Sequence, residues 1–207
     1  MRRLPAVLAL VVIALLVPAQ ALAAPDADPE LSADQLVDIL TSPDPAAGLE
    51  ALSPELQADA LSMVEADLAF TDELVRTTAL SADEAKDLGL KPTKAPKGTT
   101  AAVASGCWSH YYYTNWDLYW ATVANSWMQL NWCGRNGSIT SYSITNVGGT
   151  GTGLNYVGNS RDTRNVGWEV RGVTTHRWEF WIGGVSKCMQ IRGGATGLYS
   201  RSINCGM

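Results

Sequence analysis

The sequence has few of the side chains that hold metals or perform catalysis. Its 207 residues include two histidines and four cysteines, without a Cys-x-x-Cys pair. Structural metal sites need clustered ligands, so we expect no metal and no other cofactor. No Gly-x-Ser-x-Gly motif is present to position a nucleophilic serine. The run "GGTGTG" at 148–153 lacks the Gly-Lys-Ser/Thr of a phosphate-binding loop, and we interpret it as a turn.

Long apolar runs are also scarce, and the one that is present extends from Leu4 to Val17. Two arginines precede it and small residues close it at 21–23, which is the layout of a secretory signal peptide at 1–23. The run is shorter than the roughly 20 residues that span a bilayer. We therefore expect cleavage after Ala23, secretion, and no transmembrane segment in the mature chain.

The cysteine content agrees with secretion. In an exported chain, an even number of cysteines indicates disulfide bonds. Three pairings are possible, of which nearest-neighbour pairing closes the most local loops, joining Cys107 to Cys133 and Cys188 to Cys205. Each loop of this kind stabilises a fold by roughly 3 kcal/mol on the chain-entropy estimate.

Acidic side chains are rare in the second half of the chain. Residues 24–106 hold sixteen acidic and five basic side chains, whereas residues 107–207 hold four acidic and eight basic ones. All eight tryptophans and all seven tyrosines also lie in residues 107–207. We therefore divide the mature chain into an acidic segment at 24–90, a linker at 91–106 and an aromatic domain at 107–207. The acidic segment is expected to be a removable pro-segment or a spacer, and its charge favours docking on the basic domain before processing.

The acidic segment has helix start signals. Ser32 with Gln35, and Ser81 with Glu84, have the spacing of capping boxes. Ser53 is followed by a proline at the first helical position. After this proline we expect a helix with a thin apolar stripe, made of Leu56, Leu61, Val64, Leu68 and Val75. The segment is therefore predicted to be a loose helical hairpin or bundle.

The aromatic domain has short alternating runs and frequent glycines, which predict an all-β sandwich or barrel, and of these we expect an antiparallel β-sandwich. The expected strands are 108–121, 126–133, 138–145, 166–171, 174–182, 185–192 and 198–204.

Alternation assigns the faces of these strands. In "TTHRWEFWI" (174–182) it places His176, Trp178 and Phe180 in the core and Trp181 outside. A histidine on an apolar face is expected to be structural rather than catalytic. "SWMQLNWC" (126–133) and "NVGWEVR" (165–171) are expected to bury the alternating residues Met128, Leu130 and Trp132, and Val166, Trp168 and Val170.

The stretch "SHYYYTNWDLYW" (109–120) has six aromatic rings. Alternation puts one set inside, namely His110, Tyr112, Thr114, Trp116, Leu118 and Trp120. The other set combines phenol rings, which stack on sugars, with an amide and a carboxylate, which bind hydroxyl groups. Such rows also occur as cross-strand ladders without a ligand. The predicted contacts to a glycan or cell-envelope polymer are Tyr111, Tyr113, Asn115, Asp117, Tyr119 and, if its strand is adjacent, Trp181.

Catalysis and nucleic-acid binding are weaker hypotheses. Glu169 and Glu179 are the best carboxylate pair for glycoside hydrolysis. Ion pairs with Arg171 and Arg177 would account for both carboxylates without a catalytic role. The basic residues are too scattered for a nucleic-acid surface. We expect a binding protein without catalytic residues. A protein-directed inhibitor or antagonistic toxin, and a small glycoside hydrolase, are the alternatives.

The strings "NWCGRNGSIT" (131–140) and "CMQIRGGATGLYSRSINC" (188–205) resemble a pattern found in small secreted bacterial proteins of uncharacterised activity. The shared features are a Trp-Cys pair before a glycine turn and a following β-strand. The resemblance implies a disulfide-braced β fold over the last 100 or so residues, and it assigns no functional residue.

Overall fold

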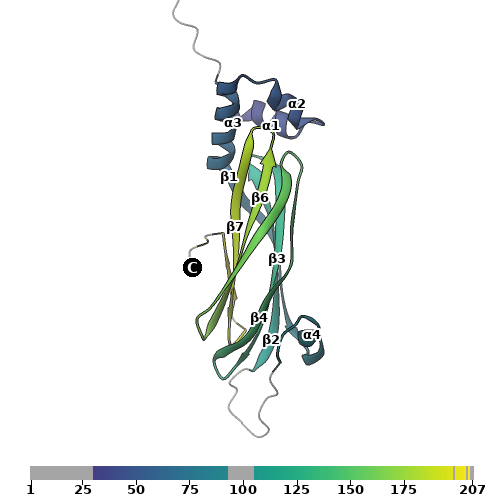
Figure 1. The fold of residues 1–207 in the computed structure, drawn as a ribbon, viewed down its shortest axis with the longest axis vertical. Helices are drawn as coiled ribbons and strands as arrows, with labels where there is room; N and C mark the ends of the chain where they lie inside the picture. Colours follow the sequence, from purple (N-terminus) through teal and green to yellow (C-terminus); the bar gives the residue numbers. More distant parts are fainter. Residues whose placement is uncertain (1–29, 93–104, 198, 204, 206–207) are drawn as a thin grey trace, which may run out of the picture. The chain divides into compact units, whose positions relative to one another are not determined.

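The computed structural model describes residues 30–92, 105–197, 199–203 and 205. The predicted signal peptide and most of the predicted linker lie outside the described residues. From Leu31 onward the chain forms one compact unit. Within its described part, eight strands form two antiparallel sheets of four strands each, in the orders β1-β2-β3-β4 and β5-β6-β7-β8 (Figure 1).

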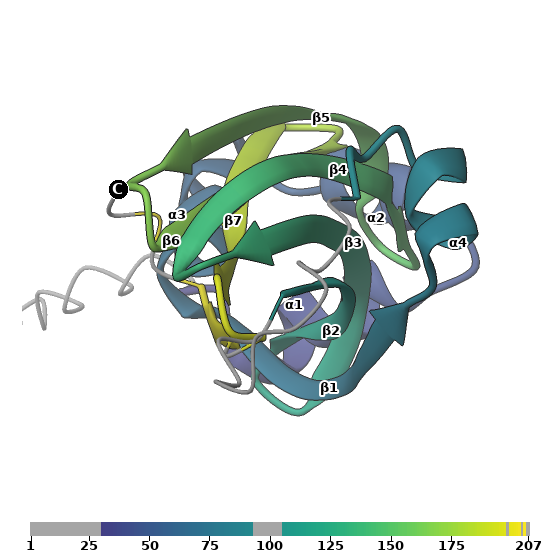
Figure 2. The ribbon, with the colours of Figure 1, turned by 90° about the horizontal axis from the view of Figure 1, so that it is seen from below.

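Four helices accompany the sheets, and they are α1 (Ala33–Leu40), α2 (Pro45–Glu50), α3 (Pro54–Asp67) and α4 (Ala82–Asp87). The first sheet consists of β1 (Leu68–Leu80), β2 (Gly106–Leu118), β3 (Ala121–Arg135) and β4 (Ser138–Gly151). The second consists of β5 (Asn155–Asn165), β6 (Glu169–Phe180), β7 (Gly183–Gly194) and β8 (Tyr199–Ser202). Figure 2 shows the first sheet curving from β1 to β4, with β5 beside β4.

The helix start signals are confirmed. Both capping boxes form, at Ser32 and at Ser81, and the Ser53 hydroxyl accepts a hydrogen bond from the backbone N–H of Leu56 at 3.3 Å. The predicted continuation of the third helix to residue 75 is wrong, because the chain becomes strand β1 at Leu68. This strand pairs with β2 along its length, from Leu68 opposite Leu118 to Leu80 opposite Cys107. A thin apolar stripe is compatible with a strand as well as with a helix. Here the segment is a strand because β2, which is distant in sequence, pairs with it.

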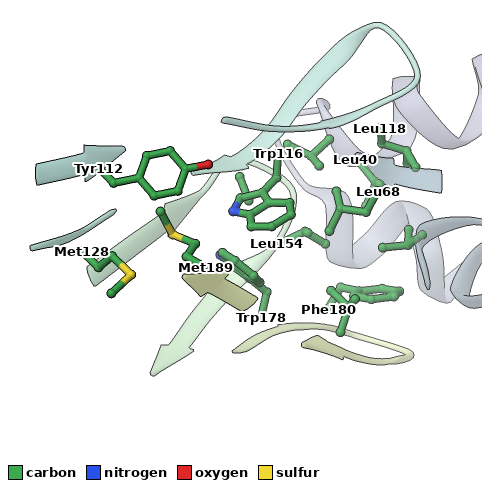
Figure 3. Close-up of a cluster of buried hydrophobic side chains, with 14 of the residues drawn as sticks. Leu40, Leu68, Tyr112, Trp116, Leu118, Met128, Leu154, Trp178, Phe180 and Met189 are labelled. Atoms are coloured by element: carbon green, nitrogen blue, oxygen red, sulfur yellow. The ribbon is translucent and has the colours of Figure 1, made fainter. Parts of the chain in front are cut away.

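The acidic segment shares a core with the aromatic domain. Leu40 of α1 and Leu68 of β1 belong to the same buried cluster as Trp116 and Phe180, which come from the two sheets (Figure 3). Strand β1 pairs with β2, and the Lys187 ammonium donates to the backbone carbonyl of Glu65 at 3.0 Å. Strand pairing and apolar packing therefore hold the segment against the domain.

Most expected strands are present, with changes in their bounds. The runs at 166–171 and 174–182 are parts of one strand, β6, and β5 was not expected because its sequence is mostly polar. The "GGTGTG" run is not a turn throughout, because β4 continues to Gly151. Asn136 and Gly137 have φ values of 52° and 75° and form the two-residue turn between β3 and β4, as hairpin geometry favours.

The alternation predicted for β2 is confirmed. Its inward side chains from His110 to Leu118 are buried, whereas Tyr111, Tyr113, Asn115 and Asp117 are only partly so. Trp120 is an exception, since β2 ends at Leu118 and the indole lies in the following turn, 62% exposed. Figure 3 shows the resulting core, in which the buried rings and thioethers of the two sheets meet, including Tyr112, Trp116, Met128, Trp178 and Met189.

The assignment of faces around residue 168 is wrong. Trp168 was expected in the core, yet it is 59% exposed, and Glu169 was expected outside, yet it is 5% exposed. The cause is local, because β6 begins only at Glu169 and the preceding turn contains Gly167 with φ of 91°. A residue in this left-handed region interrupts the period-two alternation.

Both disulfides have the expected pairing. Cys107 and Cys133 lie directly opposite each other on β2 and β3, and Cys188 joins Cys205. Among the described residues, no helix combines the length and the apolar character needed to cross a bilayer.

Candidate functional site: the outer face of the first sheet

The outer face of the first sheet carries two rows of side chains that run across its four strands. One row aligns Leu74 of β1, Tyr113 of β2, Trp127 of β3 and Gly148 of β4. The next row aligns Arg76, Tyr111, Gln129 and Thr145 in the same strand order. Because strand pairing fixes the register, these side chains lie on one continuous surface.

Two rings of the first row are nearly parallel, and Tyr113 and Trp127 are called here the aromatic platform. Their centroids are 6.4 Å apart and their planes are inclined by only 13°. Both side chains are partly exposed. The absence of a side chain at Gly148 makes room for the indole, since a Cβ there would lie 2.4 Å from Cζ2 of Trp127. The glycine therefore allows the indole to lie across β4.

Hydrogen bonds hold the polar side chains around the platform. The Gln129 amide donates to the Ser109 hydroxyl at 2.6 Å. On the other side of the platform, the Thr150 hydroxyl donates to the Asn125 side-chain carbonyl at 2.8 Å. Burial and the neighbouring phenol of Tyr113 raise the pKa of Tyr111 above its ordinary value. The phenol therefore keeps its proton at neutral pH and can act as a donor.

A groove of about 410 Å³ lies beside the platform on the same face. Its lining comes from β1, β2, β3 and β4 and includes Leu74, Arg76, Tyr111, Gln129 and Asn146. It combines an exposed leucine, a phenol ring, an amide and a guanidinium, which are groups that contact both the apolar and the hydroxylated parts of a sugar. The volume lies within the range of small-molecule sites.

The structure gathers only part of the predicted set at this surface. Tyr111, Tyr113, Asn115 and Asp117 share the outer face of β2, but both carboxylate oxygens of Asp117 accept hydrogen bonds, from Thr71 at 2.7 Å and Thr122 at 2.6 Å. Asp117 therefore braces the strands.

The other two predicted contacts lie elsewhere. Tyr119 lies in the turn after β2 and donates its hydroxyl to Asp67 at 2.9 Å. Trp181 is 64% exposed in the turn between β6 and β7, in the second sheet, so its strand is not adjacent to β2. It does not extend the tyrosine row.

Among the residues of this surface that sequence reasoning did not name as contacts are Trp127, Leu74 and Arg76. Trp127 has the same parity as Gln129, and the alternation of "SWMQLNWC" was sufficient to place it outside. Leu74 and Arg76 belong to β1, which was predicted to be helical, so no pattern placed them beside β2. Only the strand pairing reveals them.

The carboxylate pair considered for hydrolysis is not assembled. Glu169 and Glu179 lie ten residues apart on β6, which corresponds to about 33 Å along an extended strand. Glycosidases need their two carboxylates within about 10 Å. The predicted ion pair of Glu169 with Arg171 is present at 2.6 Å. Across the described residues, no three His, Cys, Asp or Glu side chains gather in a way that could hold a metal ion.

Comparison of the chain with models of protein families, with curated proteins and with solved structures finds no match.

Proposed function

We propose that this protein is a secreted, non-catalytic binding protein that recognises a glycan or cell-envelope polymer through the outer face of its first sheet. The observation that carries the proposal is the aromatic platform, two nearly parallel, partly exposed rings at a centroid distance of 6.4 Å. Aromatic rings stack on the apolar faces of sugar rings, and partly exposed aromatic side chains with polar tips are typical of binding surfaces.

The surroundings of the platform support the same ligand class. Arg76, Tyr111 and Gln129 lie one row away, and Asn115 lies opposite Asn125 on the other side. These side chains can donate to and accept from hydroxyl groups. The face therefore combines ring-stacking positions with flanking hydrogen-bonding groups, which is the chemistry that a polysaccharide surface needs.

Secretion and domain architecture are parts of the proposal. The two disulfides are typical of exported proteins, and the apolar run at 4–17 has the length of the apolar core of a signal peptide. We further propose that the two sheets pack as a β-sandwich, since both contribute buried residues to one core cluster.

Adsorption to insoluble polysaccharides tests the function. The full chain is incubated with microcrystalline cellulose, chitin and purified cell walls, and the unbound protein is measured. Tyr113→Ala and Trp127→Ala should each weaken adsorption about tenfold, because each removes a ring contact of roughly 1.5 kcal/mol. Trp120→Ala is the matched control, since this exposed indole lies in a turn away from the platform.

Retention on at least one polymer that falls in both platform variants and not in Trp120→Ala supports the proposal. Absence of retention on all three materials, or equal retention of all variants, refutes it. Thermal melting of each variant establishes that lost adsorption does not reflect unfolding.

A further inference from the structure

A second, smaller pocket lies at the opposite end of β6 from helices α1–α3 (Figure 1). Its volume is about 300 Å³, and its lining comes from the turns that connect β3 to β4, β5 to β6 and β7 to β8, together with β6, β7 and β8. This volume is at the lower end of small-molecule sites, so the pocket suits one ring rather than an oligomer. It contains no residue of the aromatic platform.

Two exposed rings line the pocket. Trp168 is 59% exposed and Tyr199 is 45% exposed. The backbone at Trp168 is held in place, because its carbonyl accepts a hydrogen bond from the N–H of Ala195 at 2.9 Å. Gly194 is also fixed, since its carbonyl accepts from the indole of Trp132 at 2.9 Å. Trp168 therefore stands on a braced turn, whereas Tyr199 begins β8 and packs its ring against His110, with the centroids 4.1 Å apart.

Glu169 and Arg192 form the charged wall of the pocket, and together with Arg171 they make a cluster of three charges. Glu169 is buried, and its two carboxylate oxygens accept from Arg171 Nε and Arg192 Nη2, each at 2.6 Å. Burial raises the pKa of Glu169, but the hydrogen bonds and charges of the two arginines outweigh this and hold its pKa below the ordinary value. With Glu169 ionised, the cluster keeps one net positive charge.

Arg192 is the member of this cluster that can meet a ligand. It lines the pocket with a side chain 35% exposed. Its Nε is buried, and the described residues offer that atom no hydrogen-bond acceptor. A guanidinium oriented by one carboxylate presents its remaining donors in a planar fork, which matches a second carboxylate. Thr196 and Ser200 add hydroxyl groups to the same lining.

We propose that this pocket binds a single sugar residue carrying a carboxylate, a uronic acid, with its ring against Trp168 and Tyr199 and its carboxylate on Arg192. The rings supply the apolar contact, the hydroxyl groups of Thr196 and Ser200 suit sugar hydroxyls, and the net positive charge selects for the acid. The site is separate from the aromatic platform and selects for charge, so it adds a second specificity to the protein.

Saturation-transfer NMR on the full chain tests this site, with sodium glucuronate as the probe. Glucose lacks the carboxylate, and acetate lacks the ring. Glucuronate should bind at least about tenfold more tightly than either, because a hydrogen bond to a charged group and the ring contact are both needed. Equal binding of glucose and glucuronate, or absence of glucuronate binding at millimolar concentration, overturns the proposal.

Variants locate the binding. Tyr199→Ala and Arg192→Lys should each weaken glucuronate binding at least about tenfold, since lysine keeps the charge and loses the planar fork. Trp181→Ala, which removes an equally exposed indole elsewhere, should leave it unchanged. Glucuronate binding that survives Tyr199→Ala overturns the assignment even if Arg192→Lys fails to fold. Trp127→Ala should not affect it, so this result is independent of polysaccharide adsorption.

Discussion

The buried histidines His110 and His176 should make the folded state sensitive to mild acid. Both side chains are fully buried. Nδ1 of His110 lies 2.8 Å from the hydroxyl of Thr77, and Nδ1 of His176 lies 3.3 Å from the hydroxyl of Tyr156. Burial lowers the pKa of each imidazole from 6.5 to about 4. The folded protein therefore keeps both rings neutral at a pH where the unfolded chain protonates them.

The sign and the size of the effect follow from these pKa values. Because the unfolded chain binds protons first, stability is complete well above pH 6.5 and is lost as the pH falls through 6.5 towards 4. Between pH 7.5 and 5.5, one such histidine lowers the free energy of unfolding by about 1 kcal/mol, and two lower it by about 2 to 3 kcal/mol. This is a large part of the stability of an ordinary domain.

Urea unfolding followed by tryptophan fluorescence measures the effect. The wild type should lose about 2 to 3 kcal/mol between the two pH values, and either His176→Gln or His110→Gln should lose about half of that. The two single variants are matched controls for each other. A wild-type free energy that does not change over this interval, or a loss of the same size in all three proteins, would refute the reasoning.

Three further outcomes are expected. Replacing Cys107 and Cys133 by alanine should lower the free energy of unfolding by about 3.5 kcal/mol in urea titrations, because the disulfide closes a 26-residue separation; a change below 1 kcal/mol would contradict this. Gly148→Ala should displace Trp127 and weaken polysaccharide adsorption about tenfold, and an unchanged isotherm would count against the platform. Cleavage at a protease site inserted within 93–104 should leave two fragments that co-elute without denaturant and separate in urea, since both belong to one core.

The predictable parts of the fold depend on local signals. Caps such as Ser32 and Ser81 fix helix starts through bonds to residues three positions away, so the sequence alone reveals them. Alternation along β2 likewise separates Tyr112 from Tyr113, because every second side chain must enter the core. Nearest-neighbour pairing of Cys107 with Cys133 follows from their position on adjacent strands of one hairpin.

The unpredicted parts depend on contacts distant in sequence. Strand β1 exists because β2 provides its hydrogen-bond partners, and a helical stripe ending at Val75 contains no sign of this. The turn at Gly167 interrupts the alternation of buried and exposed side chains. As a result Trp168, expected in the core, is exposed, and Glu169, expected outside, is buried. Because Trp168 and Glu169 both line the second pocket, the alternation of the sequence could not have identified that site.

An adsorption isotherm of the full chain on insoluble polysaccharide, compared with that of the Tyr113→Ala/Trp127→Ala double variant, tests the proposed binding face most directly. We expect saturable binding by the wild type and an affinity at least about tenfold lower in the double variant, with thermal stability retained. Equal isotherms for the two folded proteins would contradict the assignment of this face as the binding surface.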